Sequence, residues 1–309
     1  MAVPAQWCAG PPITFGAGRP YAAPTLAIRA AASGETAAEP AATLGHAISG
    51  PHLSSSSDLE RIEAACATRH ALAEARRAGG RSLVSFLVSR RAALREMSSS
   101  VRALPRIEVI ASAGPAGREI AQHLALRHAG RRVNRRAVGV LRLPEDSSVY
   151  LQGGKRQAVR TNLHHAEELG FAFRELPDAT TTRLEADRIL RLHQDEFWDA
   201  DELARSVAEG RSRVFVVADR AGAVQALAAV VVDTSWAHMY LCISDKSPSA
   251  HAALYLLNVG VVKQLAAEGL RYLFVRSAFH LTPGQRYLQA RLGFEPMNLH
   301  LAGRCPSRA

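Results

Sequence analysis

The clearest alternation of apolar and polar positions in the chain lies between residues 236 and 294. Over residues 237–244, side chains of different character alternate with a period of two, which predicts a strand between two different environments. One face of this strand carries Met239, Leu241 and Ile243, and the other carries His238, Tyr240 and Cys242. A polar loop, 245–249, follows the strand.

A long helix is predicted after this loop, over residues 249–268. Leu254, Leu257, Val261 and Leu265 recur every three or four residues and form its buried stripe, and Gly269 ends it. A second strand over 272–275 and a last helix over 283–292 follow. This succession of strand, helix, strand and helix is typical of an α/β protein.

The start of the long helix has the features of an anion site. Ser247 precedes Pro248, a helix-start signal, because the hydroxyl can cap and proline lacks only an N–H that is free there. The first turn of a helix offers free N–H groups and a partial positive charge. Lys246, Ser247 and Ser249 add polar groups. We interpret the loop as a phosphate or pyrophosphate site; a capped helix without a ligand is the alternative.

A second informative pattern covers residues 155–170. Helical spacing of apolar positions predicts a helix that Gly170 closes, and Arg156, Arg160 and His164 recur every four residues along another face. This basic stripe would either meet phosphates of a nucleotide, a coenzyme or tRNA, or lie in solvent, partly balanced by Glu167 and Glu168.

The segments between these two stretches alternate strands and helices. The predicted elements are a strand over 171–176, a helix over 181–198 that continues over 199–209, strands over 213–218 and 224–233 joined by a tight hairpin, and a final strand over 297–301. We therefore predict an α/β (α+β) fold with a mixed central sheet flanked by helices.

The N-terminal part has a different composition. Residues 1–57 are rich in Ala, Gly, Pro, Ser and Thr, lack a hydrophobic period, and predict a disordered, low-complexity segment. Residues 58–136 predict helices broken at Gly79, with a basic surface at positions 76, 77, 90, 91 and 95, then a short strand, a helix and a basic loop at 130–136. We interpret 58–136 as a helical, basic accessory region and 137–303 as the main domain.

Charge and cysteine content add a few constraints. The formal net charge is +10. Residues 1–139 carry 18 Arg or Lys and 9 Asp or Glu, which gives +9, so the excess lies upstream of the main domain. Cys8, Cys66, Cys242 and Cys305 are far apart, which favours free thiols in a reducing compartment, and we predict a cytoplasmic protein. No apolar run reaches the ~18 residues of a membrane span.

The order of elements, together with Arg291-Leu-Gly-Phe-Glu-Pro296 near the end, resembles the GNAT (N-acetyltransferase) superfamily. The helix closed by Gly170 resembles its FemAB-like branch. The resemblance covers about residues 137–302 and implies a cleft between strands 237–244 and 272–275. An acyl-CoA, such as acetyl-CoA, would place its pantetheine arm along Leu241, Cys242 and Ile243.

The resemblance further implies that the pyrophosphate of the coenzyme meets residues 245–251, which include Lys246, Ser247, Ser249, Ala250 and His251. The chain departs from the family in two places. The usual glycine-rich loop is absent, and Gln289 stands where many relatives carry a tyrosine acid, with Tyr287 about 200° away around the helix.

Acyl transfer to an amine needs a polarised carbonyl, a base and a proton for the leaving thiolate. A main-chain N–H near 241–243 is our candidate for the first role. Glu196, His238 and His280 are alternative bases, and Tyr287 is a candidate acid. We predict no metal, since no HExxH-type spacing occurs, and no serine nucleophile, since Gly-x-Ser-x-Gly is absent.

Three functions remain open at this level. The first is N-acyl transfer from acyl-CoA to an amine of a small molecule. The second is amide formation from aminoacyl-tRNA, as in FemAB-like proteins. The third is a degenerate, non-catalytic interaction module, which the missing glycines and Gln289 favour. Neither DNA nor a membrane span is expected.

Overall fold

The computed structural model describes residues 56–128, 131–133, 135–193, 199–245, 247–275 and 283–302. The disorder predicted for 1–57 falls almost wholly outside these residues. The helices are α1 Ser56–Arg77, α2 Gly80–Ser89, α3 Arg91–Ala103, α4 Pro115–Leu124, α5 Gln157–Glu168, α6 Ala179–His193, α7 Ala200–Ala208, α8 Ala250–Ala267 and α9 Pro283–Leu292, with short 3-10 helices η1 Ser147–Leu151 and η2 Gly154–Arg156.

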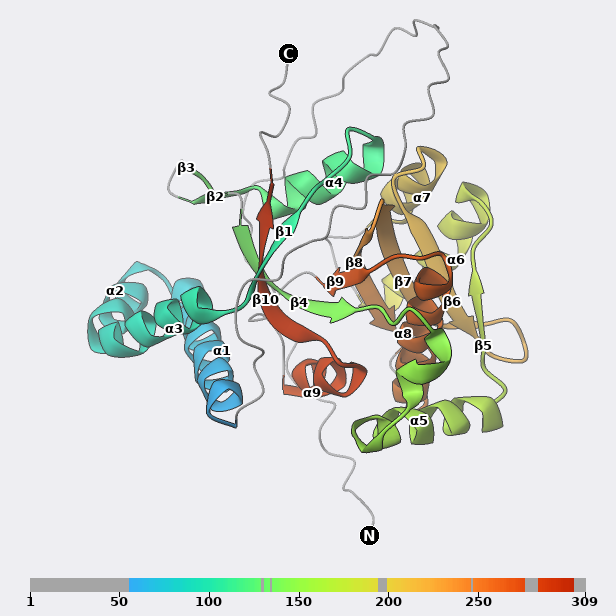
Figure 1. The fold of residues 1–309 in the computed structure, drawn as a ribbon, viewed down its shortest axis with the longest axis horizontal. Helices are drawn as coiled ribbons and strands as arrows, with labels where there is room; N and C mark the ends of the chain where they lie inside the picture. Colours follow the sequence, from blue (N-terminus) through green and yellow to red (C-terminus); the bar gives the residue numbers. More distant parts are fainter. Residues whose placement is uncertain are drawn as a thin grey trace, which may run out of the picture.

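An eight-stranded mixed sheet forms the centre of the protein (Figure 1). Its order is β1-β10-β4-β9-β8-β7-β6-β5. The strands are β1 Arg106–Val109, β4 Arg135–Arg142, β5 Ala172–Glu175, β6 Arg213–Ala218, β7 Val224–Asp233, β8 Trp236–Ser244, β9 Tyr272–Val275 and β10 Glu295–Leu301. Two pairs, β1 with β10 and β8 with β9, are parallel. The predicted mixed sheet flanked by helices is confirmed.

Helices cover both faces of the sheet, so most strand residues are buried. On one face, α8 packs Leu257, Val261 and Leu265 against Phe215 and Met239. On the other face, α4 covers one half of the sheet and α6 with α7 covers the other. Burial on both faces explains the nearly continuous apolar runs of β6 and β7.

The alternation predicted for 237–244 is correct only in its first half. Ala229 of β7 pairs with Leu241 and Val230 pairs with Met239, so Tyr240 is an extra residue in β8. This bulge shifts the side chains that follow. Met239 packs against α8, whereas Leu241 and Ile243 pack with α6 and α7 on the opposite face.

The hydroxyl of Tyr240 fixes the bulge to the rest of the fold. Its Oη donates to Ser212 Oγ at 3.2 Å, and Ser212 Oγ in turn donates to Ser206 Oγ at 2.8 Å. Burial raises the pKa of Tyr240, so the phenol stays protonated and able to donate.

Part of the predicted basic loop at 130–136 is a strand in the structure. Residues Arg131–Val133 form β3, which pairs with β2, Leu126–His128, and β4 begins at Arg135. The polar composition concealed a strand because arginines are tolerated on an edge hairpin.

The three N-terminal helices form a group at one end of the sheet, beside β1, β10 and β4 (Figure 1). Ala65, Cys66 and Leu104 form a small core between α1 and α3, against which Ala137 of β4 packs. Asn298 of β10 donates from Nδ2 to Val101 O at 2.6 Å, which joins α3 to the sheet.

The C-terminal end of α8 is fixed by an arginine on β6. Arg213 makes a bidentate pair with Glu175 of β5, at 2.7 and 2.6 Å, and a second with Glu268, which ends α8, at 2.6 and 2.8 Å. Hydrogen bonds to Glu175 and Glu268 raise the pKa of Arg213, and Arg213 lowers the pKa of Glu268. The network aligns β5, β6 and α8.

We predict that Arg213→Met lowers the free energy of unfolding at pH 7 by about 1–2 kcal/mol, because two partly buried carboxylates lose a charged donor. The pKa of Glu268 is depressed in the folded state, so its contribution is present above its unfolded pKa of 4.5 and is lost as the pH falls below it. Urea unfolding at several pH values measures this.

Arg191→Met is the matched control. Arg191 pairs with Asp187 on the exposed surface of α6, and we expect little change in stability from its loss. An equal loss in both variants, or a loss in Arg213→Met that does not shrink as the pH falls below 4.5, would contradict the role assigned to Arg213.

Candidate functional site

The candidate site lies along the second half of β8, after the last described pair between β8 and β9. β8 and β9 pair in parallel from Trp236 with Tyr272 up to Met239 with Val275. Beyond Met239, β8 continues for five residues to Ser244, and among the described residues only β7 pairs with this extension. The bulge at Tyr240 directly follows the last described pair of β8 and β9.

The free edge of this extension presents main-chain groups. The N–H of Asp245 donates to Gln225 O of β7 at 2.7 Å. Main-chain groups alternate in direction along a strand, so the N–H groups of Leu241 and Ile243 also turn toward β7. That of Cys242 then points away from β7, where it can donate to a ligand.

The N-terminus of α8 lies just after this edge. Its N-cap residue, Ser249, makes no side-chain capping bond, and Ala250 N and Ala253 N donate to Ser247 O and Ser249 O at 3.1 and 3.2 Å. The N–H groups of His251 and Ala252 have no acceptor among the described residues. The predicted cap by Ser247 is therefore wrong, and two donors stay available for an anion.

The loop before α8 is held by its own side chains. Asp245 Oδ1 accepts from Ser247 Oγ at 2.7 Å and from Ser247 N at 3.3 Å, and Ser247 Oγ lies 2.9 Å from Ser249 Oγ. These bonds divert the Ser247 hydroxyl from the helix. Lys246 lies outside the described residues.

His251 and Tyr255 share one face of α8, since they are four residues apart. Their rings meet edge to face at 5.0 Å. Partial burial lowers the pKa of His251, which favours a neutral imidazole at pH 7. Tyr255 is fully buried, and its hydroxyl has no hydrogen-bond partner among the described residues.

Tyr255 is a candidate that the sequence pattern missed. Burial is the main cause that raises its pKa, and Tyr287 and Arg291 of α9 act on it electrostatically with smaller effect. The hydroxyl therefore stays protonated at neutral pH and lies near α9. The i, i+4 spacing from His251 was the available signal, but it is equally typical of a core tyrosine.

Cys242 faces α8 from the free edge. Asn258 Nδ2 donates to its Sγ at 3.6 Å and to Leu254 O at 2.8 Å. Burial of the thiol against α8 raises its pKa to about 11, although the residue as a whole is exposed. A protonated thiol is a poor nucleophile, so the main chain of Cys242 is the more useful part.

His238 lies on the face of the sheet opposite α8. It is 1% exposed, its ring stacks on Phe274 at 4.4 Å, and it lies 3.9 Å from the ring of His123 on α4. Glu196 and His280 lie outside the described residues, so the structure places only one of the three candidate bases.

Helix α9 contributes Tyr287, Gln289 and Arg291. Tyr287 is 50% exposed, and the guanidinium of Arg291 lies 4.9 Å above its ring. Gln289 points toward β4, because a Cβ on Gly139 would lie 2.9 Å from its Oε1. The two side chains thus take different sides of α9, as their spacing predicts.

The basic stripe on α5 is partly used inside the protein. Arg160 donates to Leu151 O and Gly153 O at 2.6 and 2.9 Å. Arg156 donates to Arg291 O and lies 5.1 Å from the Tyr150 ring. These contacts join α5 to η1 and α9, which neither of the two sequence interpretations anticipated.

Two further searches concern the described residues only. Within them, no group of three or more His, Cys, Asp or Glu side chains is arranged to hold a metal ion. No helix in this part of the chain combines the length and apolarity needed to cross a membrane.

Sequence comparison found no matching family model and no matching curated protein. Among solved structures, L-PGS from Bacillus licheniformis is 12% identical with a TM-score of 0.41, over 54% of this chain and 60% of that chain. A GNAT family N-acetyltransferase from Escherichia coli, in complex with CoA, is 16% identical with a TM-score of 0.30, over 43% and 90%. An aminoglycoside acetyltransferase from a soil metagenomic sample, in complex with sisomicin, is 12% identical with a TM-score of 0.33, over 40% and 86%.

The chain thus spans about three-fifths of the length of the Bacillus protein.

We predict that Gly139→Ala lowers the free energy of unfolding by about 1–3 kcal/mol. The new Cβ would lie 2.9 Å from Gln289 Oε1 and 2.9 Å from Val275 Cγ2, so α9 or the end of β9 would have to move. Chemical denaturation measures the change. Gly154→Ala is the control, since its Cβ meets nothing within 4 Å; similar stability of the two variants would show that the contact at Gly139 is not tight.

Proposed function

We propose that this chain is a GNAT-type acyltransferase that moves an acyl group, such as acetyl, from coenzyme A to an amine of a small molecule. The observation that carries the proposal is the Tyr240 bulge of β8, after which the described residues pair β8 with β7 alone, shortly before the start of α8, which has no side-chain cap. The strand would bind the pantetheine arm of an acyl-CoA, and the helix N-terminus that follows it would bind the pyrophosphate.

The strand edge would hold the pantetheine arm and the carbonyl. The N–H group of Cys242 is a donor that faces away from β7, and it would polarise the thioester carbonyl. The pyrophosphate would lie at His251 and Ala252, whose N–H groups are free, with Lys246 and Ser249 beside it.

The reaction would proceed by direct transfer. The neutral amine attacks the carbonyl carbon, the carbon–sulfur bond breaks, and the amine proton passes to a base, for which Glu196, His238 and His280 are the candidates. The leaving thiolate takes a proton from a tyrosine. Tyr287 lies on α9 and acts electrostatically on Tyr255 of α8, and the raised pKa of Tyr255 keeps its proton in place at neutral pH.

Transfer from an aminoacyl-tRNA is the less favoured alternative. Its support from the α5 stripe is reduced, because Arg156 and Arg160 already bind main-chain carbonyls. The proposed site at β8 and α8 would bind a coenzyme thioester and a small amine, and it requires no contact with tRNA.

We expect calorimetric titration at low salt to show saturable binding of acetyl-CoA and of free coenzyme A. Lys246→Ala should weaken both by roughly tenfold or more, because a charged donor to phosphate is lost. Lys263→Ala, on the exposed face of α8, is the matched control and should bind as the unmodified protein does. No binding of either ligand would refute the acyl-CoA proposal, and charged tRNA would then be titrated.

We expect Tyr255→Phe to slow thiol release from acetyl-CoA by about 100-fold with an accepting amine, and to leave coenzyme affinity unchanged. The substitution removes only the hydroxyl, so the buried ring still fills its place. Tyr287→Phe is measured beside it with the same panel of small amines. Loss of turnover in Tyr287→Phe alone would assign the acid role to Tyr287.

A further inference from the structure

Helix α2 exposes apolar side chains that no described part of the protein covers. None of its ten residues is buried. Val84, Leu87 and Val88 are 61%, 42% and 74% exposed. Their spacing of three and four residues puts them on one face of the helix. Aliphatic side chains are normally buried inside a globular protein. An exposed aliphatic face on a short helix therefore marks a contact surface.

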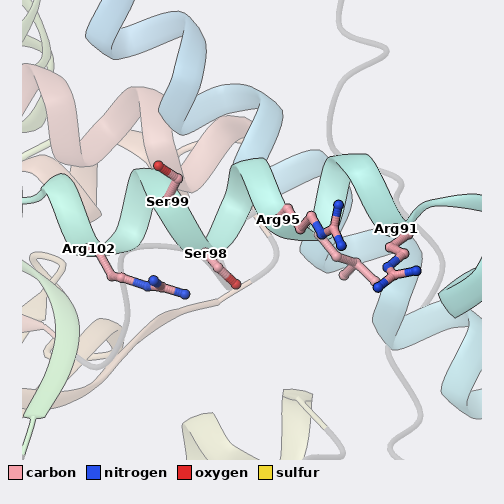
Figure 2. Close-up of a pocket in the computed structure, with 6 residues that line it drawn as sticks. Arg91, Arg95, Ser98, Ser99 and Arg102 are labelled. Atoms are coloured by element: carbon pink, nitrogen blue, oxygen red, sulfur yellow. The ribbon is translucent and has the colours of Figure 1, made fainter.

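Helix α3 carries a row of arginines next to this face. Only Arg90 separates the two helices, so Val88 is three residues before Arg91, the first residue of α3. Arg91, Arg95 and Arg102 lie along α3 with Ser98 and Ser99 and line a hollow of about 470 Å³ (Figure 2). No ion pair or hydrogen bond joins these three guanidiniums to any described residue.

These three arginines differ from five others on the described surface. Arg183, Arg191, Arg205, Arg211 and Arg213 all pair with carboxylates. Among the described residues no carboxylate pairs with Arg91, Arg95 or Arg102, so this face of α3 is electropositive and suited to phosphate groups.

We propose that α2 and α3 bind the surface of a bilayer that contains anionic phospholipids, and so hold the protein at a membrane without spanning it. The aliphatic side chains of α2 enter the boundary between headgroups and acyl chains, and the arginines of α3 bind lipid phosphates. An RNA would satisfy the arginines but would leave Val84, Leu87 and Val88 in water, and no exposed aromatic side chain of α2 or α3 is present to stack on bases.

This proposal is independent of the acyl-transfer function, because α2 and α3 contribute nothing to the β8 and α8 site. The occupant is defined by both observations together. Aliphatic side chains alone would suit another protein surface, and arginines alone would suit any polyanion. Their adjacency on successive helices matches the two layers of a lipid interface.

The test is sedimentation of the full chain with vesicles of phosphatidylcholine alone and of phosphatidylcholine with about 30% phosphatidylglycerol, a fraction chosen to resemble an anionic membrane surface. We expect binding to the anionic vesicles only, weakened by salt. Replacing Arg91, Arg95 and Arg102 by Ser should lower the partition coefficient by about a hundredfold, since each arginine near the surface contributes about fivefold.

Two other variants separate charge from apolar contact. The control variant replaces three exposed arginines of α6 by Ser, namely Arg183, Arg188 and Arg191. It loses the same charge and should keep most of the vesicle binding. Val84→Ser with Val88→Ser removes the aliphatic part without changing charge and should lower binding by at least tenfold. Circular dichroism checks that each variant is folded.

Three results would overturn the proposal. The first is equal loss of vesicle binding in the α3 and α6 arginine variants, which indicates net charge only. The second is tight binding of RNA that depends on the α3 arginines while anionic vesicles are not bound. The third is self-association that Val84→Ser with Val88→Ser abolishes, again without vesicle binding, which would assign the apolar face to a second copy of the chain.

Discussion

The single extra residue in β8 is the constraint on which the candidate site depends. Tyr240 has no partner opposite it in β7, so the strand changes direction and the faces of its side chains exchange. Before the bulge, β8 lies between two strands. After it, among the described residues, β8 has a neighbour on one side only, and its Cys242 N–H group faces the other side. The buried bond from Tyr240 to Ser212 keeps this geometry fixed.

The two ends of helix α8 have different roles: the C-terminal end stabilises the fold, and the N-terminal end forms part of the candidate site. Its C-terminal end is held by Glu268 in the Arg213 network, and its middle fills the core against β6, β7 and β8. Its N-terminal end is left without a side-chain cap. A helix fixed along most of its length can present two free N–H groups in a constant position, which is the preorganisation that anion binding requires.

The distribution of arginines shows how one residue type takes separate roles. On α5, Arg156 and Arg160 donate to main-chain carbonyls and hold helices together. On β6, Arg213 joins two carboxylates. On α3, three arginines have no ion-pair partner among the described residues, and the helix follows α2 with its exposed aliphatic side chains. The location of the arginines that lack a described partner is therefore more informative about binding partners than the net charge of the chain.

The sequence by itself determined the elements and their order. The apolar stripe of α8 and the stop at Gly269 predicted a helix that the structure places at Ala250–Ala267, and the span of α9 was predicted at both ends. These features depend on local spacing, which a sequence displays directly.

Only the tertiary structure decided which groups meet. The bulge at Tyr240 depends on a neighbouring strand, the Ser247 hydroxyl turned to Asp245 instead of capping α8, and Gln289 lies against β4 because Gly139 has no side chain. Tyr255 became a candidate only when burial showed its hydroxyl without a partner in the described structure. Hydrogen bonds and contacts between residues far apart in the chain leave no period in the sequence, so the position of each side chain had to come from the fold.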